Sequence, residues 1–345
     1  MRIAVTGGCG FIGSAVIRHL VGDLGFSVLN IDKMTYAANS AAVESVSRSP
    51  NYRFAQADIL DRTAIDDLFR SFRPEALYHL AAESHVDRSI SEPDIFVETN
   101  VLGTQRLIGA VRTYLGETPG MEHFRMIHVS TDEVFGELGD HPDSKFTEDT
   151  PYDPRSPYSA SKAASDHLIR AAINTYGLPA LITNCSNNYG PFQNEEKLIP
   201  LMISRALSDQ PLPVYGQGHQ IRDWLYVEDH ARGIVTAHQK GAIGRSYNFG
   251  GNNEMRNIDV VNTLCALLQD RAECAERLPA SKRFADLISF VTDRAGHDFR
   301  YAIDASRARD ELGWEPSVSF DEGLSRTVAW YVDRILTGET MEQPA

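Results

Sequence analysis

Short strand-like runs alternate with amphipathic stretches through the first 190 residues of the chain. Such alternation is typical of βαβ units. It predicts an α/β fold with a doubly wound parallel sheet of six or seven strands and helices on both faces. The expected strands are RIAVT (2–6), SVLNI (27–31), YRFAQAD (52–58), EALYHLA (75–81), FRMIHVS (124–130) and ALITNCS (180–186). The expected helices run from about Ile12, near 62–72, near 94–115, and from Tyr158 to about Tyr176.

The regular alternation ends after Pro191. Pro, Gly and Asn break the segments that follow, such as QPLPVYGQGHQIRDW (210–224), into short elements. We therefore expect a smaller, mostly C-terminal α/β domain, with a return of the chain to the sheet near 226–250. The predicted division is 1–190 with 226–250 for the larger domain, and 191–225 with 251–335 for the smaller one.

The composition excludes several classes of protein. The formal net charge of −14 creates a field that repels polyanions, so we expect no nucleic-acid partner. The four cysteines are scattered without a Cys-x-x-Cys pair, which indicates neither a zinc site nor a redox motif. No apolar run approaches the length of a membrane span, and the N-terminus lacks the pattern of a signal peptide. We expect a cytoplasmic protein with no membrane partner and no metal.

A glycine-rich turn follows the first strand and opens the first helix. VTGGCGFIGSA places Gly7, Gly10 and Gly13 where a tight turn and a close backbone approach to a pyrophosphate are needed. The second strand ends at Asp32, about 20 residues further on, as in dinucleotide-binding βαβ units. A carboxylate there would accept hydrogen bonds from ribose hydroxyls and repel a 2′-phosphate, which favours NAD over NADP. The positive charge of Lys33 beside it slightly weakens this preference. A glycine turn with a solvated Asp is the alternative for either element alone.

A second motif lies in PRSPYSASKAASDHL (154–168). Tyr158 and Lys162 are four positions apart, so a phenol and an ammonium share one helix face. A nearby cation favours the phenolate, so we expect a lowered pKa of Tyr158 and a usable base. The alternative is a surface helix pair, but the position of the motif beyond a strand that ends in Ser130 and Thr131 favours catalysis.

Together, the glycine turn, Asp32, HLAAESHVD (79–87), the Ser/Thr strand end and the Tyr158/Lys162 pair resemble the extended short-chain dehydrogenase/reductase family, from residue 1 to beyond 300. The resemblance implies a Rossmann-type larger domain that binds NAD. It also implies that Tyr158 takes a hydroxyl proton during hydride transfer and that Lys162 holds the nicotinamide ribose. The cofactor residues expected from the motifs and the resemblance are Gly7, Gly10, Phe11, Ile12, Gly13, Asp32, Lys33, Asp58, Ile59, Leu80, Ala81, Ala82, Thr99, Tyr158, Lys162 and Asn188.

Two adjacent acids, Asp132 and Glu133, follow the strand that ends in Thr131. Hydride transfer from a sugar alcohol does not need them, because Tyr158, Thr131 and the cofactor already supply its parts. Oxidation at sugar carbon 4 acidifies the hydrogen on carbon 5. A base could then remove that hydrogen while an acid protonates the departing hydroxyl of carbon 6, and two carboxylates with separated pKa values suit these roles. The alternative is a polar turn that caps the next element.

Further segments, including VSTDEVFG (129–136), CSNNYGP (185–191) and VYGQGHQIRDWLYVEDH (214–230), resemble one subfamily, the dTDP-glucose 4,6-dehydratases. The resemblance implies that Glu133 is the base at carbon 5, that Asp132 is the acid at carbon 6 and that Thr131 holds the carbon-4 hydroxyl. The expected substrate residues are Ser84, Thr131, Asp132, Glu133, Asn187, Lys197, Leu198, Pro213, Val214, Tyr215, Arg222, Asn257, Asp293 and His297. The chain departs from the subfamily at Cys9, Asn184 and Ala295, where Ala, Arg and Pro are usual.

The leading hypothesis is therefore a lyase that converts dTDP-glucose to dTDP-4-keto-6-deoxyglucose and water, with NAD unchanged overall. One alternative is an epimerase or dehydratase acting on a UDP-, GDP- or CDP-hexose; an epimerase would not need the acid pair. Another is a non-catalytic NAD-binding protein, which would have no use for Tyr158, Lys162 and both acids together. The family resemblance also implies a homodimer formed through the helices near 94–115 and 158–176.

Overall fold

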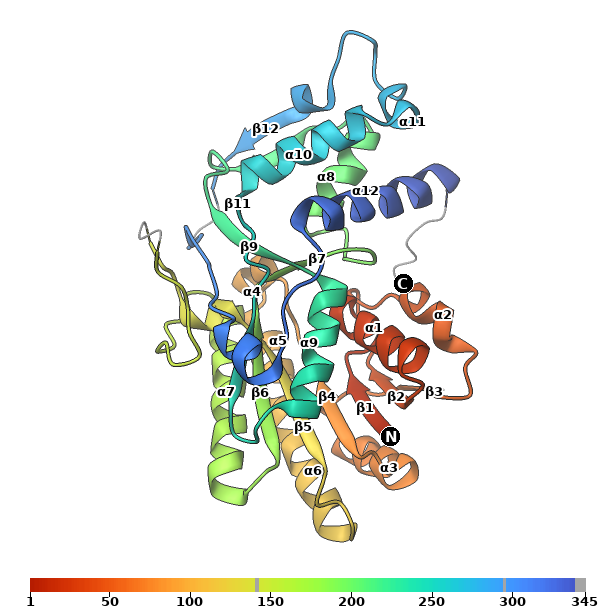
Figure 1. Ribbon diagram of the computed structural model, residues 1–345, viewed down its shortest axis with the longest axis vertical. Coiled ribbons are helices and arrows are strands. Elements are labelled where there is room, and N and C mark those ends of the chain that lie inside the picture. Colours follow the sequence, from red (N-terminus) through yellow and green to blue (C-terminus); the bar gives the residue numbers. More distant parts are fainter. Residues whose placement is uncertain (140–142, 294–295, 339–345) are drawn as a thin grey trace.

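A seven-stranded parallel sheet forms the centre of the larger part of the molecule (Figure 1). The structure is a computed structural model, and it describes residues 1–139, 143–293 and 296–338. The strand order is β10-β6-β5-β4-β1-β2-β3, and every neighbouring pair is parallel. The bounds are β1 Arg2–Thr6, β2 Ser27–Asp32, β3 Tyr52–Gln56, β4 Ala76–His79, β5 Arg125–Thr131, β6 Ala180–Cys185 and β10 Ser246–Phe249. The expected doubly wound α/β fold is confirmed.

Successive residues of β1 face opposite layers of the sheet. Ile3 and Val5 pack with α1 (Phe11–Arg18) and α9 (Val227–Lys240), whereas Ala4 packs with the helices of the other layer. These helices are α3 (Arg62–Phe72), α6 (Thr104–Glu117) and α7 (Pro157–Tyr176). Because both faces of the sheet are covered, most residues of its strands are buried; the edge strand β3 is the exception, with Arg53, Phe54 and Gln56 exposed.

Local sequence signals explain where two of these helices begin and end. Asp61 caps α3 by accepting a hydrogen bond from the Ala64 amide at 3.1 Å. Ser156 and Ser159 form a reciprocal capping box at the start of α7, which ends at Gly177 in the left-handed region (φ 66°). Both helices match the ranges expected from the sequence.

The stretch expected as one helix near 94–115 is more complex. α4 (Val86–Ser91) lies before this stretch, and α5 (Pro93–Phe96) forms its start. A π-helical segment over Val97–Gly103 then leads into α6. The π-helical segment places Asn100 in the interior, where it bonds to the backbone of Glu83. Such segments are wider than an α-helix and often occur at functional sites.

The smaller part of the molecule stands above the carboxyl ends of the central strands in Figure 1. Its three-stranded sheet has the order β11-β9-β7, and β12 pairs in parallel with β8. Its helices α8, α10 and α12 enclose a separate apolar core. The bounds are β7 Asn187–Tyr189, α8 Leu198–Leu207, β8 Leu212–Tyr215, β9 Ile221–Tyr226, β11 Glu254–Arg256, α10 Asn257–Gln269, β12 Ile288–Val291 and α12 Phe320–Thr337.

The remaining elements are short. Two further α-helical turns are α2 (Glu44–Ser47) and α11 (Ala272–Ala275). 3₁₀ turns cover Ser40–Val43, Asp132–Phe135 and Phe284–Leu287, and π turns cover His19–Asp23 and Ala308–Leu312.

Candidate active site

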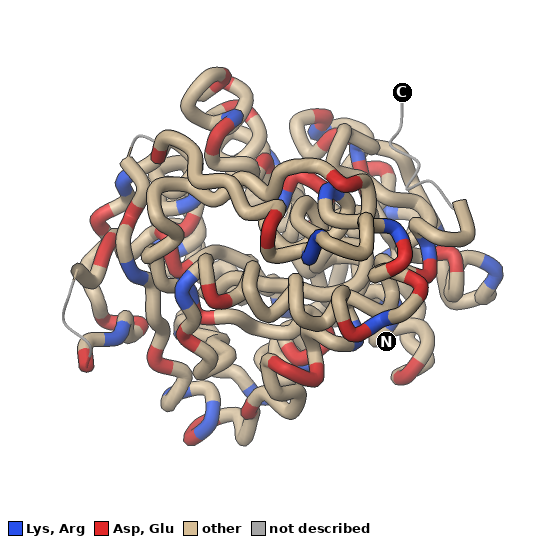
Figure 2. Tube along the Cα trace, turned by 90° about the horizontal axis from the view of Figure 1, so that it is seen from above, with Lys and Arg blue, Asp and Glu red and all other residues tan. Residues whose placement is uncertain are grey.

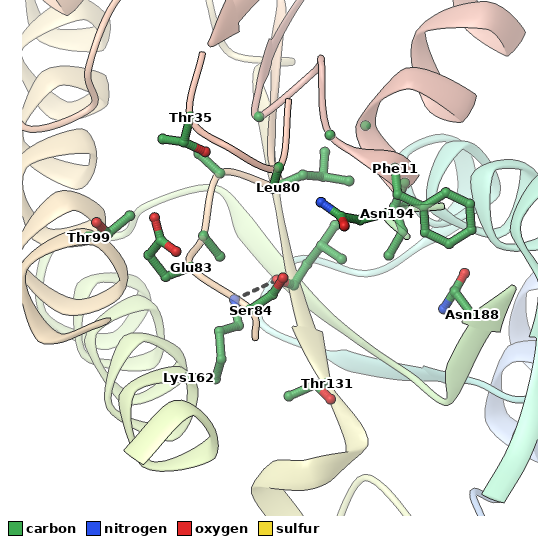
Figure 3. A pocket seen from close by; sticks show the side chains of 18 of the residues that line it. Phe11, Thr35, Leu80, Glu83, Ser84, Thr99, Thr131, Lys162, Asn188 and Asn194 are labelled. Atoms are coloured by element: carbon green, nitrogen blue, oxygen red, sulfur yellow. Dashed lines mark hydrogen bonds between the residues drawn. The ribbon is translucent and has the colours of Figure 1, made fainter. Parts of the chain in front are cut away.

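A pocket of about 320 Å³ opens at the carboxyl ends of the central strands. Its walls come from the loops that follow β1, β2, β3, β4, β5 and β6, together with α7 and the segment 193–197. Figure 3 shows Thr131 at the end of β5, Lys162 on α7 and Leu80 after β4 around the same space. In doubly wound sheets, ligands bind at this edge, where the strand order reverses.

The glycine turn leaves no room for side chains. Gly7 has φ +73°, and a Cβ atom on it would lie 2.6 Å from the amide nitrogen of Ala81. A Cβ atom on Gly13 would lie 2.1 Å from the carbonyl oxygen of Gly7. Gly10 precedes the first residue of α1, so the positive end of this helix faces the pocket. The turn therefore fits a pyrophosphate that approaches the backbone closely.

Asp32 is tied to the glycine turn. One carboxylate oxygen accepts the amide of Cys9 at 2.9 Å, and the other accepts the amide of Met34 at 2.8 Å. Lys33 pairs instead with Asp58 at 2.7 Å, which directs its charge away from Asp32. Burial raises the pKa of Asp32, and the two amide bonds counteract this effect. The turn and the carboxylate thus form one unit that fits the adenosine end of NAD.

Tyr158 and Lys162 are buried on the pocket side of α7. The ammonium of Lys162 donates to the carbonyl oxygen of Val129 at 2.8 Å. The expectation that the pKa of Tyr158 is lowered is wrong for this structure. Burial, followed by the negative charge of Glu133, raises the pKa of Tyr158 well above its usual value, while a hydrogen bond with Thr131 lowers it. Burial of the phenol and the carboxylate of Glu133 thus oppose the effect expected from the cation on the same helix.

Asp132 and Glu133 both line the pocket. They begin a 3₁₀ turn that Thr131 caps, with its hydroxyl accepting the Glu133 amide at 3.3 Å. Asp132 is 2% exposed, and its Oδ2 atom has no hydrogen-bond partner among the described residues. Burial, and then the charges of Glu133 and Asp223, raise the pKa of Asp132 well above its usual value. Asp132 therefore keeps its proton to a higher pH than an ordinary aspartic acid, next to a second carboxyl group.

The pocket brings together every residue expected to bind the cofactor or to take part in catalysis. It also includes Ser84, Asn187 and Lys197 from the expected substrate set. Other expected substrate residues do not line it and lie in the smaller part of the molecule. They are Leu198 on α8, Pro213, Val214 and Tyr215 on β8, Arg222 on β9, Asn257 at the start of α10, and Asp293 and His297 after β12.

Three of these residues form a second group. The ring of Tyr215 packs edge-on against His297 with centroids 6.1 Å apart, and His297 Nδ1 lies 2.6 Å from a carboxylate oxygen of Asp293. The other oxygen of Asp293 accepts a bond from Gln220 at 2.7 Å. These three expected substrate residues are thus adjacent to one another, outside the main pocket.

Arg222, one of the expected substrate residues, is buried. Its guanidinium donates to the carbonyl oxygens of Ile221 at 2.8 Å and Asp298 at 2.9 Å, and lies 4.3 Å from the ring centroid of Tyr301. Its charge also lowers the pKa of Asp132, which places it near the acid pair. Arg222 thus lies in the smaller part of the molecule, close to the acid pair.

Sequence reasoning missed several residues of the pocket wall. Glu83 is the clearest example, because it is 6% exposed and lies inside HLAAESHVD, one of the segments that carry the family resemblance. The signal was its position in the loop that follows β4, because ligands bind at this edge of the sheet. Other missed wall residues are Ile31, Thr35, Ala37, Ala38, Ala57, Val129, Ser130, Cys185, Ser186, Gln193 and Asn194.

Two of the three departures from the subfamily pattern have clear surroundings. Cys9 is buried under the turn, with its sulfur accepting a bond from Asn30 at 3.3 Å. Asn184 is fully buried on β6 and donates to the carbonyl oxygen of Thr131 at 3.0 Å. Asn184 therefore supports the strand end that presents the acid pair. Ala295 lies outside the described residues.

Comparison with known proteins decides the family. The model of the GDP-mannose 4,6 dehydratase family matches residues 4–327. The chain belongs to this family. Among its curated relatives, a dTDP-glucose 4,6-dehydratase of Neisseria meningitidis serogroup B is 54% identical over 334 residues, covering 96% of this chain and 93% of the relative. The dTDP-glucose 4,6-dehydratase 1 of Escherichia coli K12 is 52% identical over 342 residues, covering 96% of this chain and 93% of the relative.

Solved structures agree with this dehydratase family. DesIV, a dTDP-glucose 4,6-dehydratase from Streptomyces venezuelae solved with NAD bound, has a TM-score of 0.88 and 40% identity, and the match covers 99% of this chain and all of DesIV. A UDP-glucose 4-epimerase of Thermus thermophilus with NAD is more distant, with 28% identity and a TM-score of 0.82 over 96% of this chain and 99% of the epimerase.

Acidic and basic residues are interspersed along the trace, with a net charge of −14 over the whole sequence (Figure 2). Within the described ranges, no helix is long and apolar enough to cross a membrane. In the same part of the chain, no three His, Cys, Asp or Glu side chains are grouped as a metal would require.

Proposed function

We propose that the protein is a dTDP-glucose 4,6-dehydratase, which converts dTDP-D-glucose to dTDP-4-keto-6-deoxy-D-glucose and water. The observation that carries this proposal is the acid pair: Asp132 and Glu133 line the same pocket as Thr131, Tyr158 and Lys162. Curated relatives with this activity are 51–55% identical over 96% of the chain, which supports the same conclusion.

Each side chain of the pocket is assigned a step of the reaction according to its position. When bound, NAD supplies the hydride acceptor for carbon 4 and the hydride donor for carbon 6. Thr131 holds the carbon-4 hydroxyl, and Tyr158, which is hydrogen-bonded to Thr131, takes the proton of that hydroxyl in its phenolate form. Lys162 supplies positive charge beside Tyr158 and holds the nicotinamide ribose.

The acid pair performs the elimination. Glu133 removes the proton from carbon 5, and Asp132, held protonated by burial, gives its proton to the leaving hydroxyl of carbon 6. One water leaves, and Glu133 returns a proton to carbon 5 as the hydride reaches carbon 6. Over one turnover Tyr158 gains one proton and Asp132 loses one, so the number of protons on the protein does not change.

We further propose that the two parts of the molecule divide the ligands, with NAD on the central sheet and the nucleotide of the substrate on the smaller part. The glycine turn supports the first assignment. The Tyr215, Asp293 and His297 group supports the second.

The experiment is to incubate the purified protein with dTDP-, UDP-, GDP- and CDP-glucose without added NAD, and to follow loss of water by mass spectrometry. We expect conversion of dTDP-glucose. The alternative, an NAD-dependent epimerase or dehydratase for another nucleotide sugar, predicts either an isomer without mass loss or water loss from a different nucleotide.

We also propose a cytoplasmic homodimer. Apolar side chains of the α4–α7 layer are exposed, among them Ile90, Val97, Leu102 and Tyr176, and α6 and α7 pack side by side (Figure 1). A second copy would cover these side chains. Light scattering should give twice the chain mass, and Val97→Asp should shift the protein toward monomer; a monomeric parent would contradict the proposal.

A further inference from the structure

A third buried polar residue continues the catalytic face of α7. Asp166 lies four positions after Lys162, which lies four positions after Tyr158, so the three side chains follow one face of the helix. Asp166 is fully buried and does not line the pocket, so it has no part in the proposed chemistry. A buried carboxylate is costly unless its oxygens are bonded and its charge is compensated.

Three donors hold the carboxylate of Asp166. His128 Nε2 lies 3.0 Å from Oδ1, and the hydroxyls of Ser130 and Tyr152 each donate to Oδ2 at 2.8 Å. His128 and Ser130 belong to β5, the strand that ends in Thr131. Asp166 therefore ties α7, which carries Tyr158 and Lys162, to the strand that presents the acid pair.

The carboxylate keeps its charge. Burial raises the pKa of Asp166, but the hydrogen bonds from His128 and Ser130 and the charge of Lys162 act in the opposite direction, and this pKa lies below its usual value. His128 itself is neutral at neutral pH, because burial and the charge of Lys162 lower its pKa. Lys162 is thus the buried cation that balances Asp166.

Lys162 needs such a balance. Its ammonium donates to the carbonyl oxygen of Val129, which is an uncharged acceptor. Burial lowers the pKa of Lys162, and Asp166 is the main group that raises it again. Without this carboxylate, the ammonium would lose its proton more easily in the interior.

We propose that Asp166 is a positioning residue of the reaction: its carboxylate, fixed from β5, keeps the ammonium of Lys162 charged beside Tyr158. The catalytic consequence rests on the proposed function. The charge state of Lys162 does not rest on the proposed function, because this charge state depends on the packing of α7 against the sheet.

The other titratable groups around this pair leave Asp166 as its source of negative charge. Burial raises the pKa of Cys185 and Tyr152 and lowers that of His79, so these three groups are neutral at neutral pH. Burial also raises the pKa of Tyr158 and Asp132, which makes them weaker sources of negative charge than Asp166. Arg170 donates to the Tyr152 hydroxyl at 3.1 Å, and Glu133 faces Tyr158. The groups that face Lys162 and Asp166 are therefore His79 on β4, His128 on β5, Cys185 on β6, Asp132 and Glu133 after β5, Tyr152 before α7, and Tyr158 and Arg170 on α7.

The test is Asp166→Asn, with the side-chain nitrogen of Lys162 followed by ¹⁵N NMR as a function of pH. We expect the titration midpoint of Lys162 to fall by about one pH unit or more. The alkaline limb of the kcat/KM profile should move to lower pH by the same amount, with the KM for the nucleotide sugar unchanged. The matched control is Asp229→Asn, which removes an equally buried carboxylate on α9 that accepts bonds from Ser317 and Val318.

Several results would overturn the proposal. An unchanged Lys162 midpoint in Asp166→Asn is one, and an equal shift in Asp229→Asn is another. A Tyr152→Phe variant removes a neutral donor and keeps the charge, so a shift as large as that of Asp166→Asn would assign the effect to the hydrogen bond. If Asp166→Asn does not fold, the ¹³C carboxyl shift of Asp166 in the parent decides, because a protonated Asp166 at neutral pH contradicts the proposal. If the enzymatic proposal fails, the NMR titration remains interpretable.

Discussion

Replacing Glu133 by Gln should separate hydride transfer from proton transfer. Gln has nearly the same volume and leaves the backbone bond from residue 133 to the Thr131 hydroxyl intact, so the 3₁₀ turn should persist. What disappears is a base at carbon 5. A positioned general base contributes about 10²–10⁴-fold to the rate, which corresponds to about 2.7–5.4 kcal/mol of barrier. We expect the overall turnover to fall by this factor.

The oxidation half of the reaction should respond differently. Glu133 raises the pKa of Tyr158, so its neutralisation should make the phenol a stronger acid and move the acid limb of hydride transfer to lower pH. The assay measures a rapid absorbance change of the reduced nicotinamide under single-turnover conditions. It is paired with incorporation of solvent deuterium at carbon 5. We expect the burst to remain and the deuterium incorporation to disappear.

The control for this experiment is Glu137→Gln. Glu137 lies on the same loop, accepts the amide of Phe299 at 2.8 Å and pairs with Arg155, but it does not line the pocket. This variant should exchange deuterium at the parental rate. Parental exchange in Glu133→Gln, or equal loss of hydride transfer and exchange, would refute the assignment of Glu133 as the base.

Three further predictions concern the remaining parts of the site. Asp132→Asn should slow elimination by about 10²–10⁴-fold. The folded-state pKa of Asp132 is raised, so the free energy of unfolding of the parent should fall, relative to this variant, as the pH rises from the ordinary Asp range toward the raised pKa. Denaturant unfolding at several pH values measures this trend. Its absence would show that the carboxyl group of Asp132 is ionised in the folded protein. Gly13→Ala should release NAD and destabilise the protein by more than about 1 kcal/mol, because the new Cβ atom would lie 2.1 Å from a backbone oxygen. The control Gly22→Ala, whose Cβ atom would have its nearest neighbour at 3.8 Å, should retain NAD. Equal NAD content of the two variants after purification would contradict this prediction. Asp32→Ala should weaken NAD binding by about 10- to 100-fold while weakening NADP binding less, and calorimetry that finds equal losses would argue against a ribose contact.

Much of the fold could be predicted from the sequence because the signals are local. The capping residues Asp61 and Ser156 set the starts of α3 and α7, and the glycine turn identifies the edge of the sheet where the ligand binds. The acid pair could be recognised because two adjacent carboxyl groups after a buried strand are hard to explain by structure alone.

The missed features depend on contacts between distant segments. The π-helical segment that brings Asn100 to Glu83 gives no periodic signal of its own. The raised pKa of Tyr158 depends on burial and on Glu133 from a different element. The anchoring of Asp166 joins a helix to β5, and nothing in the local sequence reports that pairing.

The central claim is that a hydride leaves one carbon of the sugar and returns to another carbon of the same molecule. The most direct measurement uses dTDP-glucose carrying deuterium at carbon 4, with the purified protein, no added NAD, and NMR of the product. The account predicts a 4-keto product with the deuterium in its carbon-6 methyl group. Deuterium found back on carbon 4 of an epimerised sugar, or lost from the product, would contradict it.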